Sequence, residues 1–336
     1  MKKLIVHIGY AKTATTSLQL NLFSSLRQKG KLEYLNHLNR KDLNLGDIYC
    51  KNIVSYITGM GELEKCEGEL RKLREIKHDV SIISAETLVT FCEGFTWDNL
   101  NSHASRNAVK IKSILSPYFD EIHIIMTIRA QQTLIPSAYA QWHTQIKSID
   151  KTTTLSHWLN DTFSKSKDDR ELMFNFDQMY TAYSQSFGHE NVNVLIYEDL
   201  KYDKLQFYKQ LALLLNIMPD ELESLLEISL QNKTLNSGSN KLVAEAPSFS
   251  DVFLSYIRPP LKKLLPKRLF KPLRSAYVAS IGKVLSVIKV KTEVCIDNLT
   301  EEEKSVIQKR FAASNLNLAK KLNLDLVKLK QYGYFN

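Results

Sequence analysis

Short apolar runs alternate with longer amphipathic stretches along most of the chain. Four runs rich in Ile, Val and Leu predict strands, near residues 3–8, 80–84, 122–128 and 192–197. Stretches with apolar residues three or four positions apart predict helices, near residues 17–29, 62–76, 104–116, 155–164, 173–187 and 203–216. Strands and helices that alternate in this way favour a parallel sheet with helices on both faces. We therefore expect an α/β fold of three layers with a central, mostly parallel sheet.

The chain has 336 residues, of which 44% are hydrophobic, so we expect one domain over residues 1–336. Its cysteines form no CxxC pair and have no nearby histidine pattern, so the sequence predicts neither a zinc site nor a disulfide framework. They are Cys50, Cys66, Cys92 and Cys295. The first apolar run is too short for a signal peptide, and no stretch approaches the roughly 20 apolar residues of a spanning helix. We expect reduced thiols and a cytoplasmic protein.

The stretch HIGYAKTATTS, residues 7–17, follows the first predicted strand and is dense in hydrogen-bond donors. It holds Lys12, Thr13, Thr15, Thr16 and Ser17. The helix that follows would direct the free N–H groups of its first turn, and its positive dipole end, into this loop. The pattern is typical of a phosphate site, although such hydroxyl groups also serve as ordinary helix caps and the lysine as a solvated loop residue.

The register of this loop differs from that of a nucleoside-triphosphate P-loop. That motif has Gly, four residues and then Gly-Lys-Ser/Thr, whereas counting from Gly9 places Ala14, Thr15 and Thr16 at those positions. The lysine therefore comes three residues too early. In addition, the strand near residues 122–128 is followed by Arg129 rather than by an aspartate that would hold Mg²⁺.

Arg129 follows a predicted strand, and Ser137 comes eight residues later on or near the start of a helix. Ligands of open α/β sheets bind at the carboxyl ends of the strands, where Lys12 and Arg129 are both expected. One anionic ligand can therefore contact both groups. The alternatives are a surface ion pair for Arg129 and a helix cap for Ser137.

These residues carry a family resemblance. HIGYAKTATTSLQ resembles the 5′-phosphosulfate loop of sulfotransferases that use 3′-phosphoadenosine 5′-phosphosulfate (PAPS), in particular the bacterial pattern H-I-G-x-x-K-T-G-T-T-x-L-Q. Ala14 replaces the glycine of that pattern, and alanine is the least costly replacement where φ is negative. RAQQTLIPSAYAQ, residues 129–141, is similar to the family's 3′-phosphate segment. NVLIYEDL (193–200) and FAASNLNLAKKL (311–322) resemble a later strand and turn and the closing helix.

The resemblance implies a P-loop-like sulfotransferase architecture and a transfer of the sulfuryl group of PAPS without a metal ion. Lys12 would meet the negative charge that grows on the bridging oxygen as the bond to the 5′-phosphate breaks. The 5′-phosphate would be held by the loop residues, Lys12, Thr13, Ala14, Thr15, Thr16 and Ser17. Arg129 and Ser137 would hold the 3′-phosphate that distinguishes PAPS from common nucleotides.

The acceptor also needs a base. Glu86 follows the predicted strand at 80–84, at the carboxyl edge of the sheet, where a carboxylate with a raised pKa is suited to this role. Glycan sulfotransferases commonly have a glutamate there. The alternatives are a helix cap or surface carboxylate for Glu86, and His103 or His123 as the base. For Glu198 and Asp199 we expect a role in shaping the turn after their strand, with Asp199 as a helix cap.

The sequence says less about the acceptor. Gln141, Trp142 and the region around Trp97 would suit an open cleft for a sugar, but aromatic residues at such spacings are more often part of the core. Residues 231–241 resemble the family's late loop over the nucleotide. We expect a glycan, glycolipid or small-molecule acceptor with a hydroxyl or amine group. A kinase-like nucleotide-binding protein without sulfuryl transfer is the alternative.

A basic, amphipathic segment at residues 250–291 interrupts the family-like pattern. It holds ten Lys and Arg residues and one acid, so its net charge of +9 equals that of the whole chain, and the other 294 residues sum to zero. Interleaved Leu, Phe, Tyr and Val suit an anionic membrane surface or a polyanionic acceptor, and no nucleic-acid motif accompanies the charge. We expect peripheral membrane contact through this segment, and a solvated pair of helices is the alternative.

Overall fold

The computed structural model describes residues 1–10, 12–35, 50–90, 100–150, 154–164, 171, 173–231, 242–245, 293–296 and 298–336. Contacts between residues divide the chain into two compact units. The first unit comprises residues 1–135, 159–239 and 300–336, and the second comprises residues 136–158 and 240–299. The predicted single domain over residues 1–336 stays a prediction.

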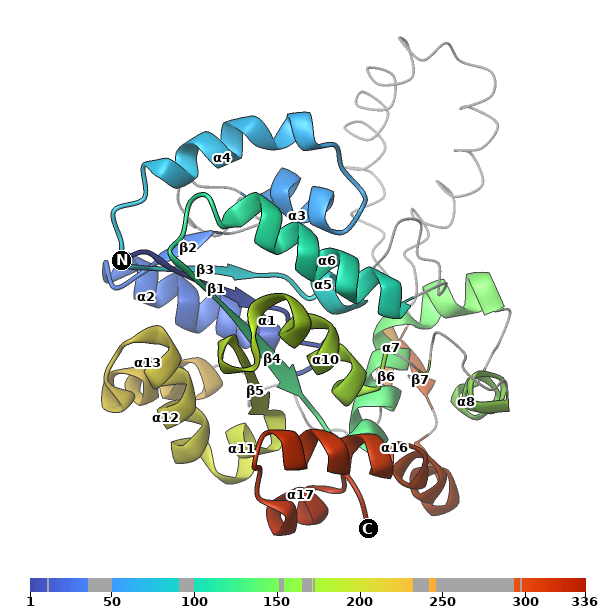
Figure 1. The fold of residues 1–336 in the computed structure, drawn as a ribbon. Helices are drawn as coiled ribbons and strands as arrows, with labels where there is room; N and C mark the ends of the chain where they lie inside the picture. Colours follow the sequence, from blue (N-terminus) through green and yellow to red (C-terminus); the bar gives the residue numbers. More distant parts are fainter. Residues whose placement is uncertain are drawn as a thin grey trace, which may run out of the picture. The chain divides into compact units, whose positions relative to one another are not determined.

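A parallel sheet of five strands forms the centre of the first unit (Figure 1). Its strands are β1 (Lys3–His7), β2 (Glu33–Leu35), β3 (Val80–Ser84), β4 (Glu121–Ile128) and β5 (Val192–Ile196). The order across the sheet is β2-β3-β1-β4-β5, and each neighbouring pair runs parallel. The carboxyl ends of β3, β1 and β4 therefore lie side by side at one edge, with β1 in the middle.

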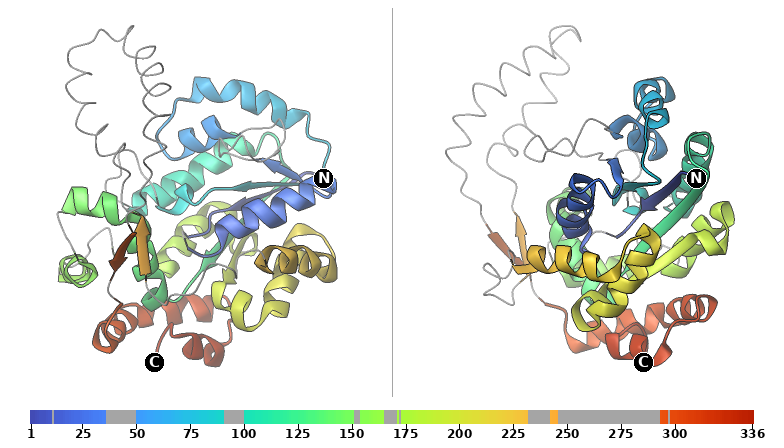
Figure 2. Two further views of the ribbon diagram at one scale, coloured as in Figure 1. Left: turned by 180° about the vertical axis from the view of Figure 1, so that it is seen from behind. Right: turned by 90° about the vertical axis from the view of Figure 1, so that its left-hand side faces the viewer.

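Helices cover both faces of this sheet, as the views from the front and from behind show (Figures 1 and 2). One face packs against α6 (Leu100–Leu115) and α10 (Phe176–Phe187). The opposite face packs against a helical run over residues 15–28 and against α12 (Lys204–Leu215) and α13 (Pro219–Gln231). Because alternate strand residues point to opposite faces, Ile5 joins the second of these cores. The predicted three-layer α/β fold is confirmed.

The remaining helices are shorter or peripheral. The run over residues 15–28 consists of α1 (Thr15–Ser17), a π-helical segment (Leu18–Phe23) and α2 (Ser24–Gln28). A 3₁₀ turn (Leu63–Cys66) leads into α4 (Glu67–Arg74), and a second (His189–Asn191) leads into β5. The others are α3 (Lys51–Ile57), α5 (Thr87–Thr90), α7 (Gln131–Asp150), α8 (Leu155–Ser164), α11 (Tyr197–Tyr202), α16 (Glu301–Lys321) and α17 (Leu326–Tyr332).

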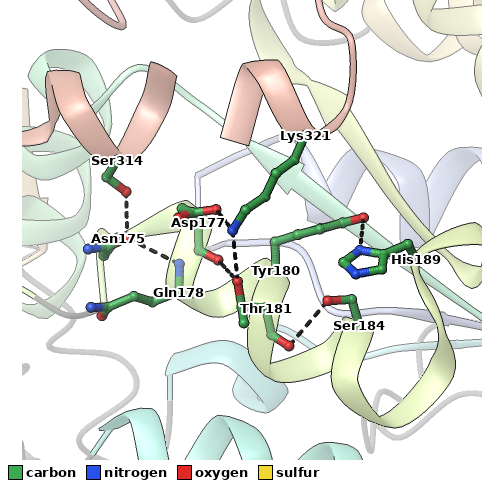
Figure 3. A network of polar contacts seen from close by, with 9 residues as sticks. All are labelled: Asn175, Asp177, Gln178, Tyr180, Thr181, Ser184, His189, Ser314 and Lys321. Carbon is green, nitrogen blue, oxygen red and sulfur yellow. Dashed lines mark hydrogen bonds and ion pairs between the residues drawn. The ribbon is translucent and has the colours of Figure 1, made fainter. Parts of the chain in front are cut away.

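Polar contacts attach α16, the long helix before the C-terminal helix α17, to α10 (Figure 3). Lys321 forms a 2.6 Å ion pair with Asp177 and also donates to Thr181 at 3.3 Å. One end of α10 is capped by Asn175, whose side chain accepts from the backbone N–H of Gln178 and from the hydroxyl of Ser314. The C-terminal segment is thus fixed to a helix that itself packs on β4 and β5.

The second unit contains a two-stranded antiparallel ladder, formed by β6 (Leu242–Glu245) and β7 (Glu293–Ile296). Leu242 pairs with Ile296, and Glu245 pairs with Glu293. The basic segment 250–291 lies outside the described residues, as do Cys92, Trp97 and most of the loop 231–241. The ladder therefore places the residues just before and just after the stretch 246–292, which contains the basic segment, next to each other.

The four predicted strands are confirmed to within one residue at each end. The strand β2 was not predicted, because three residues are too few to show a periodic pattern. The helix expected from residue 17 begins two residues earlier, inside the hydroxyl-rich stretch. Cys50 and Cys66 are free, buried thiols, and burial raises the pKa of Cys66 to about 11.

Candidate functional site

The loop after β1 is held together by its own hydroxyl groups. The side chains of Thr13 and Thr15 are buried, and each donates to the carbonyl oxygen of Tyr10, at 2.5 and 3.2 Å. Lys12 and Thr16 are exposed at the surface of the loop. The two buried threonines therefore shape the loop, whereas the lysine side chain is accessible at its surface.

Two residues of this loop have left-handed backbone conformations although neither is glycine. Lys12 has φ 66° and Ala14 has φ 64°, and Ala14 is the residue that precedes the helical run. The Cβ atom makes this conformation unfavourable by roughly 1–2 kcal/mol for residues other than glycine. The negative φ that would make alanine the least costly replacement for glycine is therefore not found at Ala14, where the conformation is one that glycine adopts without this cost.

Arg129 joins the end of β4 to the lysine loop. Its Nη1 atom donates to the carbonyl oxygen of Lys12 at 3.0 Å, and its Nε atom donates to the hydroxyl of Thr133 at 3.0 Å. The guanidinium lies 4.8 Å from the ring centroid of Tyr197, the first residue of α11. Residues 117 positions apart in the sequence thus place two cationic side chains at one edge of the sheet.

Glu86 approaches the same loop from the other side. It comes two residues after β3, which neighbours β1 on the side away from β4. Burial raises the pKa of Glu86, while a hydrogen bond with the Thr15 side chain and the charge of Lys12 act in the opposite direction. Glu86 is therefore a partly buried carboxylate whose pKa is raised by burial and which interacts with both Thr15 and Lys12 of the loop.

Glu198 supports the backbone beneath Arg129. It is buried, and its carboxylate accepts from the backbone N–H of Ala130 at 3.0 Å and from the hydroxyl of Tyr334 at 2.9 Å. Burial raises the pKa of Glu198. This residue therefore ties the turn after β5 to the residue that follows Arg129 and to the C-terminal tail.

Asp199 does not cap a helix, so that prediction is wrong. Helix α11 begins after Ile196 without a side-chain cap, and the cap of α12 is Asp203, which accepts from the N–H of Gln206. Asp199 instead forms a 2.8 Å ion pair with Lys328 of α17. A carboxylate inside a first helical turn is free to bond across to another element, and here that element is the C-terminal helix.

A cavity of about 930 Å³ lies beside Arg129. Its walls come from the start of α7, from α11 and from α17, and they include Arg129, Thr133, Tyr197, Lys201, Lys328 and Tyr332. Its volume is in the range of pockets that hold nucleotides and other small ligands. Tyr197 and Thr133 were not predicted from the sequence as site residues, although Tyr197 comes directly after a strand, a signal that could have identified it.

The other sequence candidates lie in several places. Ser137 is half-buried on α7 and belongs to the second unit, and its role at a 3′-phosphate stays a prediction. His123 lies in the middle of β4, opposite Ile5 and away from the carboxyl edge, and His103 is near Arg106 on α6. Trp142 is 5% exposed, which agrees with a core residue rather than a cleft wall.

Gln131, also part of the resembling segment, has a structural role. Its side-chain amide exchanges two hydrogen bonds of 2.9 Å with the buried amide of Asn315 on α16. Asn315 in turn donates to the carbonyl oxygen of Tyr334 at 2.8 Å. This amide pair holds the first turn of α7, and with it the residues next to Arg129, against the C-terminal segment.

No cluster of three or more His, Cys, Asp or Glu side chains suited to a metal ion occurs among the residues that the structure describes. In the same part of the chain, no helix is both long enough and apolar enough to cross a membrane.

Comparison with known proteins gives likenesses to solved structures only. No protein-family model matches the chain, and no curated protein matches it in sequence. A sulfotransferase from Alicyclobacillus acidocaldarius is similar in structure, with a TM-score of 0.48 and 11% identity over 98% of this chain and 99% of that one. A mouse sulfotransferase complexed with PAP has a TM-score of 0.39 and 12% identity over 85% and 88% of the two chains.

The left-handed conformation of Ala14 leads to a prediction about stability. We expect Ala14→Gly to raise the free energy of unfolding by about 0.5–1 kcal/mol, because glycine adopts positive φ without the steric cost. Thermal or urea unfolding measures the change. The matched control is Ala313→Gly, at an exposed position inside α16, which should lower the stability by a similar amount. A loss of stability from both substitutions would contradict the strain assigned to Ala14.

Proposed function

We propose that this protein transfers the sulfuryl group of PAPS to a hydroxyl or amine of an acceptor. The single observation that carries the proposal is the hydrogen bond of 3.0 Å from Arg129 Nη1 to the carbonyl oxygen of Lys12. It brings a lysine-bearing loop, suited to a 5′-phosphosulfate, within a few ångströms of a guanidinium suited to a 3′-phosphate. A nucleotide with phosphates on both sides of its ribose fits such a pair of cations.

The order of the strands suggests from which sides the nucleotide and the acceptor would approach the lysine loop. The nucleotide would lie on the β4 and β5 side of the lysine loop, where the cavity beside Arg129 and the ring of Tyr197 offer room for an adenosine. The acceptor would come from the β3 side, where Glu86 lies. An in-line displacement needs the attacking atom and the leaving group on opposite sides of the sulfur atom, and the positions of Glu86 and Arg129 on either side of the lysine loop support this placement.

The proposed step needs no oxidant or reductant. The acceptor oxygen or nitrogen forms a bond to sulfur while the bond from sulfur to the bridging phosphate oxygen breaks. Glu86 takes the proton of the acceptor, and Lys12 compensates the negative charge that develops on the bridging oxygen. The backbone N–H groups of the loop would hold the 5′-phosphate, because the hydroxyl groups of Thr13 and Thr15 already have partners in Tyr10 and, for Thr15, also in Glu86.

Removing Lys12 should affect turnover, whereas removing Arg129 should affect binding of the nucleotide. We expect Lys12→Ala to lower kcat by a hundredfold or more, equivalent to about 3 kcal/mol, with the affinity for 3′,5′-bisphosphate mostly kept. Arg129→Ala should weaken binding of the bisphosphate and reduce its preference over the 5′-monophosphate, because a charge-assisted contact is lost. Turnover assays and calorimetric titration measure these effects.

The controls for this pair are Lys29→Ala and Arg71→Ala, two exposed basic residues away from the loop. Unchanged turnover of Lys12→Ala would contradict its role, and unchanged affinity of Arg129→Ala would remove the 3′-phosphate site from it. The unmodified protein should be stabilised in thermal unfolding by the bisphosphate, since a ligand bound only by the folded state raises Tm. Stabilisation by ATP with Mg²⁺ alone would favour the kinase-like alternative.

Glu86 gives a prediction about pH. Because burial raises its pKa, the carboxylate form needed for proton abstraction is gained at a higher pH than for an ordinary glutamate. We therefore expect kcat/KM to rise with pH through that raised pKa. Glu86→Gln should remove this limb and lower kcat by about 10²–10⁴-fold. A pH profile with the same limb in the variant would assign the base to another residue.

We further propose that the basic segment 250–291 brings the protein to an anionic membrane surface that carries the acceptor. Its local net charge of +9 and its interleaved apolar residues support this proposal. The pairing of β6 with β7 allows a clean test. Glu245 and Glu293 are opposite each other, so an Asn-Gly pair can replace residues 246–292 as a two-residue hairpin without a change of register.

The shortened protein should bind the bisphosphate as the full chain does but sediment less with vesicles that contain phosphatidylserine. The variant with Lys262, Lys263, Lys267 and Arg268 changed to Gln should show a partial loss. Sedimentation of the full chain should decrease as salt rises, because screening weakens the attraction. Equal sedimentation and equal KM for a vesicle-borne acceptor in all three proteins would reduce the segment to a structural elaboration.

A further inference from the structure

A buried histidine lies at the point where the three central strands end. His7 is the last residue of β1, and its side chain is 0% exposed. Its Nδ1 atom is 2.8 Å from the hydroxyl of Ser84, the last residue of β3. Its Nε2 atom is 3.2 Å from the hydroxyl of Thr127, the penultimate residue of β4. One imidazole ring therefore connects the ends of all three strands.

These strands lead directly to the three proposed functional groups. Lys12 follows β1, Glu86 follows β3 and Arg129 follows β4, each within five residues of the strand end. Backbone bonds continue the connection past the strands, from Ala85 N–H to the carbonyl of His7 and from Ile8 N–H to that of Ile125. A change in the position of the ring would therefore move the starting points of all three loops.

The ring also supports the start of the lysine loop. A Cβ atom on Gly9 would lie 2.6 Å from His7 Nε2 and 3.2 Å from Thr15 Oγ1, so the backbone of the loop passes directly over the imidazole. Gln19, in the helical run beyond the loop, donates to both the carbonyl oxygen and the hydroxyl of Ser84, at 3.0 Å each. Both ends of the loop are thus attached to the same pair, His7 and Ser84.

Hydroxyl groups can donate or accept, so the roles of the two ring nitrogens of His7 depend on its tautomer. We assign the proton to Nε2, so that the ring accepts from the Ser84 hydroxyl and donates to the Thr127 hydroxyl. Complete burial lowers the pKa of His7 to about 4, so the ring is neutral at neutral pH. Only the neutral ring is able to accept at one nitrogen and donate at the other, which makes it suited to a fixed spacing between two hydroxyl groups.

We propose that His7 is a positioning residue that sets the distances between Lys12, Glu86 and Arg129 through its bonds to Ser84 and Thr127. The proposal rests on the proposed function for its effect on turnover. A misplacement of about 1 Å is enough to lower a rate by about a hundredfold, whereas ground-state binding tolerates it better. His7 should therefore affect kcat more than the affinity for the nucleotide.

Three variants separate positioning from stability. His7→Leu removes both contacts, leaving the buried Thr127 hydroxyl without its ring partner and the Ser84 hydroxyl with Gln19 alone, so it should lower both Tm and kcat. The triple variant His7→Leu/Ser84→Ala/Thr127→Val replaces the whole polar group with apolar side chains and should recover most of the Tm. We expect its kcat to stay lower by about tenfold or more, with KM for PAPS within about threefold. His7→Asn, which keeps a polar atom near the position of Nδ1, should retain more turnover than His7→Leu.

Hydrogen exchange followed by mass spectrometry gives a measurement that does not depend on turnover. In the triple variant the backbone amides of residues 9–17 should exchange faster than in the parent protein, while those of α10 should be unchanged. Recovery of kcat together with Tm, or unchanged exchange of the loop, would overturn the role of His7. If the parent protein transfers no sulfuryl group from PAPS, the proposed function fails, and the exchange result alone decides the role of His7.

Discussion

The hydrogen bond between the Arg129 guanidinium and the carbonyl oxygen of Lys12 is the contact on which the candidate site depends. It joins two loops that follow neighbouring parallel strands, and parallel strands alone do not determine how their loops approach each other. The bond also restrains the orientation of the guanidinium, which donates a second hydrogen bond to the Thr133 hydroxyl and lies over the ring of Tyr197. A cation restrained in three directions loses little conformational freedom when it binds an anion, and this favours affinity.

The buried support of this cation comes from the end of the chain. Glu198 is bonded to Ala130 and Tyr334, and Gln131 is bonded to Asn315, so the two residues that follow Arg129 are both attached to the segment 300–336. Polar contacts of α16 with α10 fix that segment in turn (Figure 3). Buried networks of this kind specify one arrangement, because each unpaired member would cost roughly 1–3 kcal/mol. The position of Arg129 is therefore fixed by contacts with the C-terminal segment and not only by its own neighbours in the candidate site.

The sequence predicted the central strands and the loop at residues 7–17 because both depend on local patterns, an apolar run and a cluster of donors. It also predicted that Lys12 and Arg129 approach each other, since strand ends of a parallel sheet share an edge. It could not predict that Thr13 and Thr15 are turned inward to Tyr10, because the direction of a hydroxyl group depends on the backbone of the loop. The roles of Glu198 and Asn315 could not be predicted either, since Glu198 bonds to Ala130, 68 positions away, and Asn315 bonds to Gln131, 184 positions away.

The left-handed conformations of Lys12 and Ala14 have a consequence for how such loops are recognised. The loop's shape is set by a positive φ at two positions, and neither lysine nor alanine belongs to the small set of residues, chiefly glycine and asparagine, that adopt it readily. A search pattern that demands glycine would pass over this loop, whereas a search for two positive φ values after a buried strand would find it. Conformational fingerprints of this kind would extend detection to chains in which the sequence signature has drifted but the geometry persists.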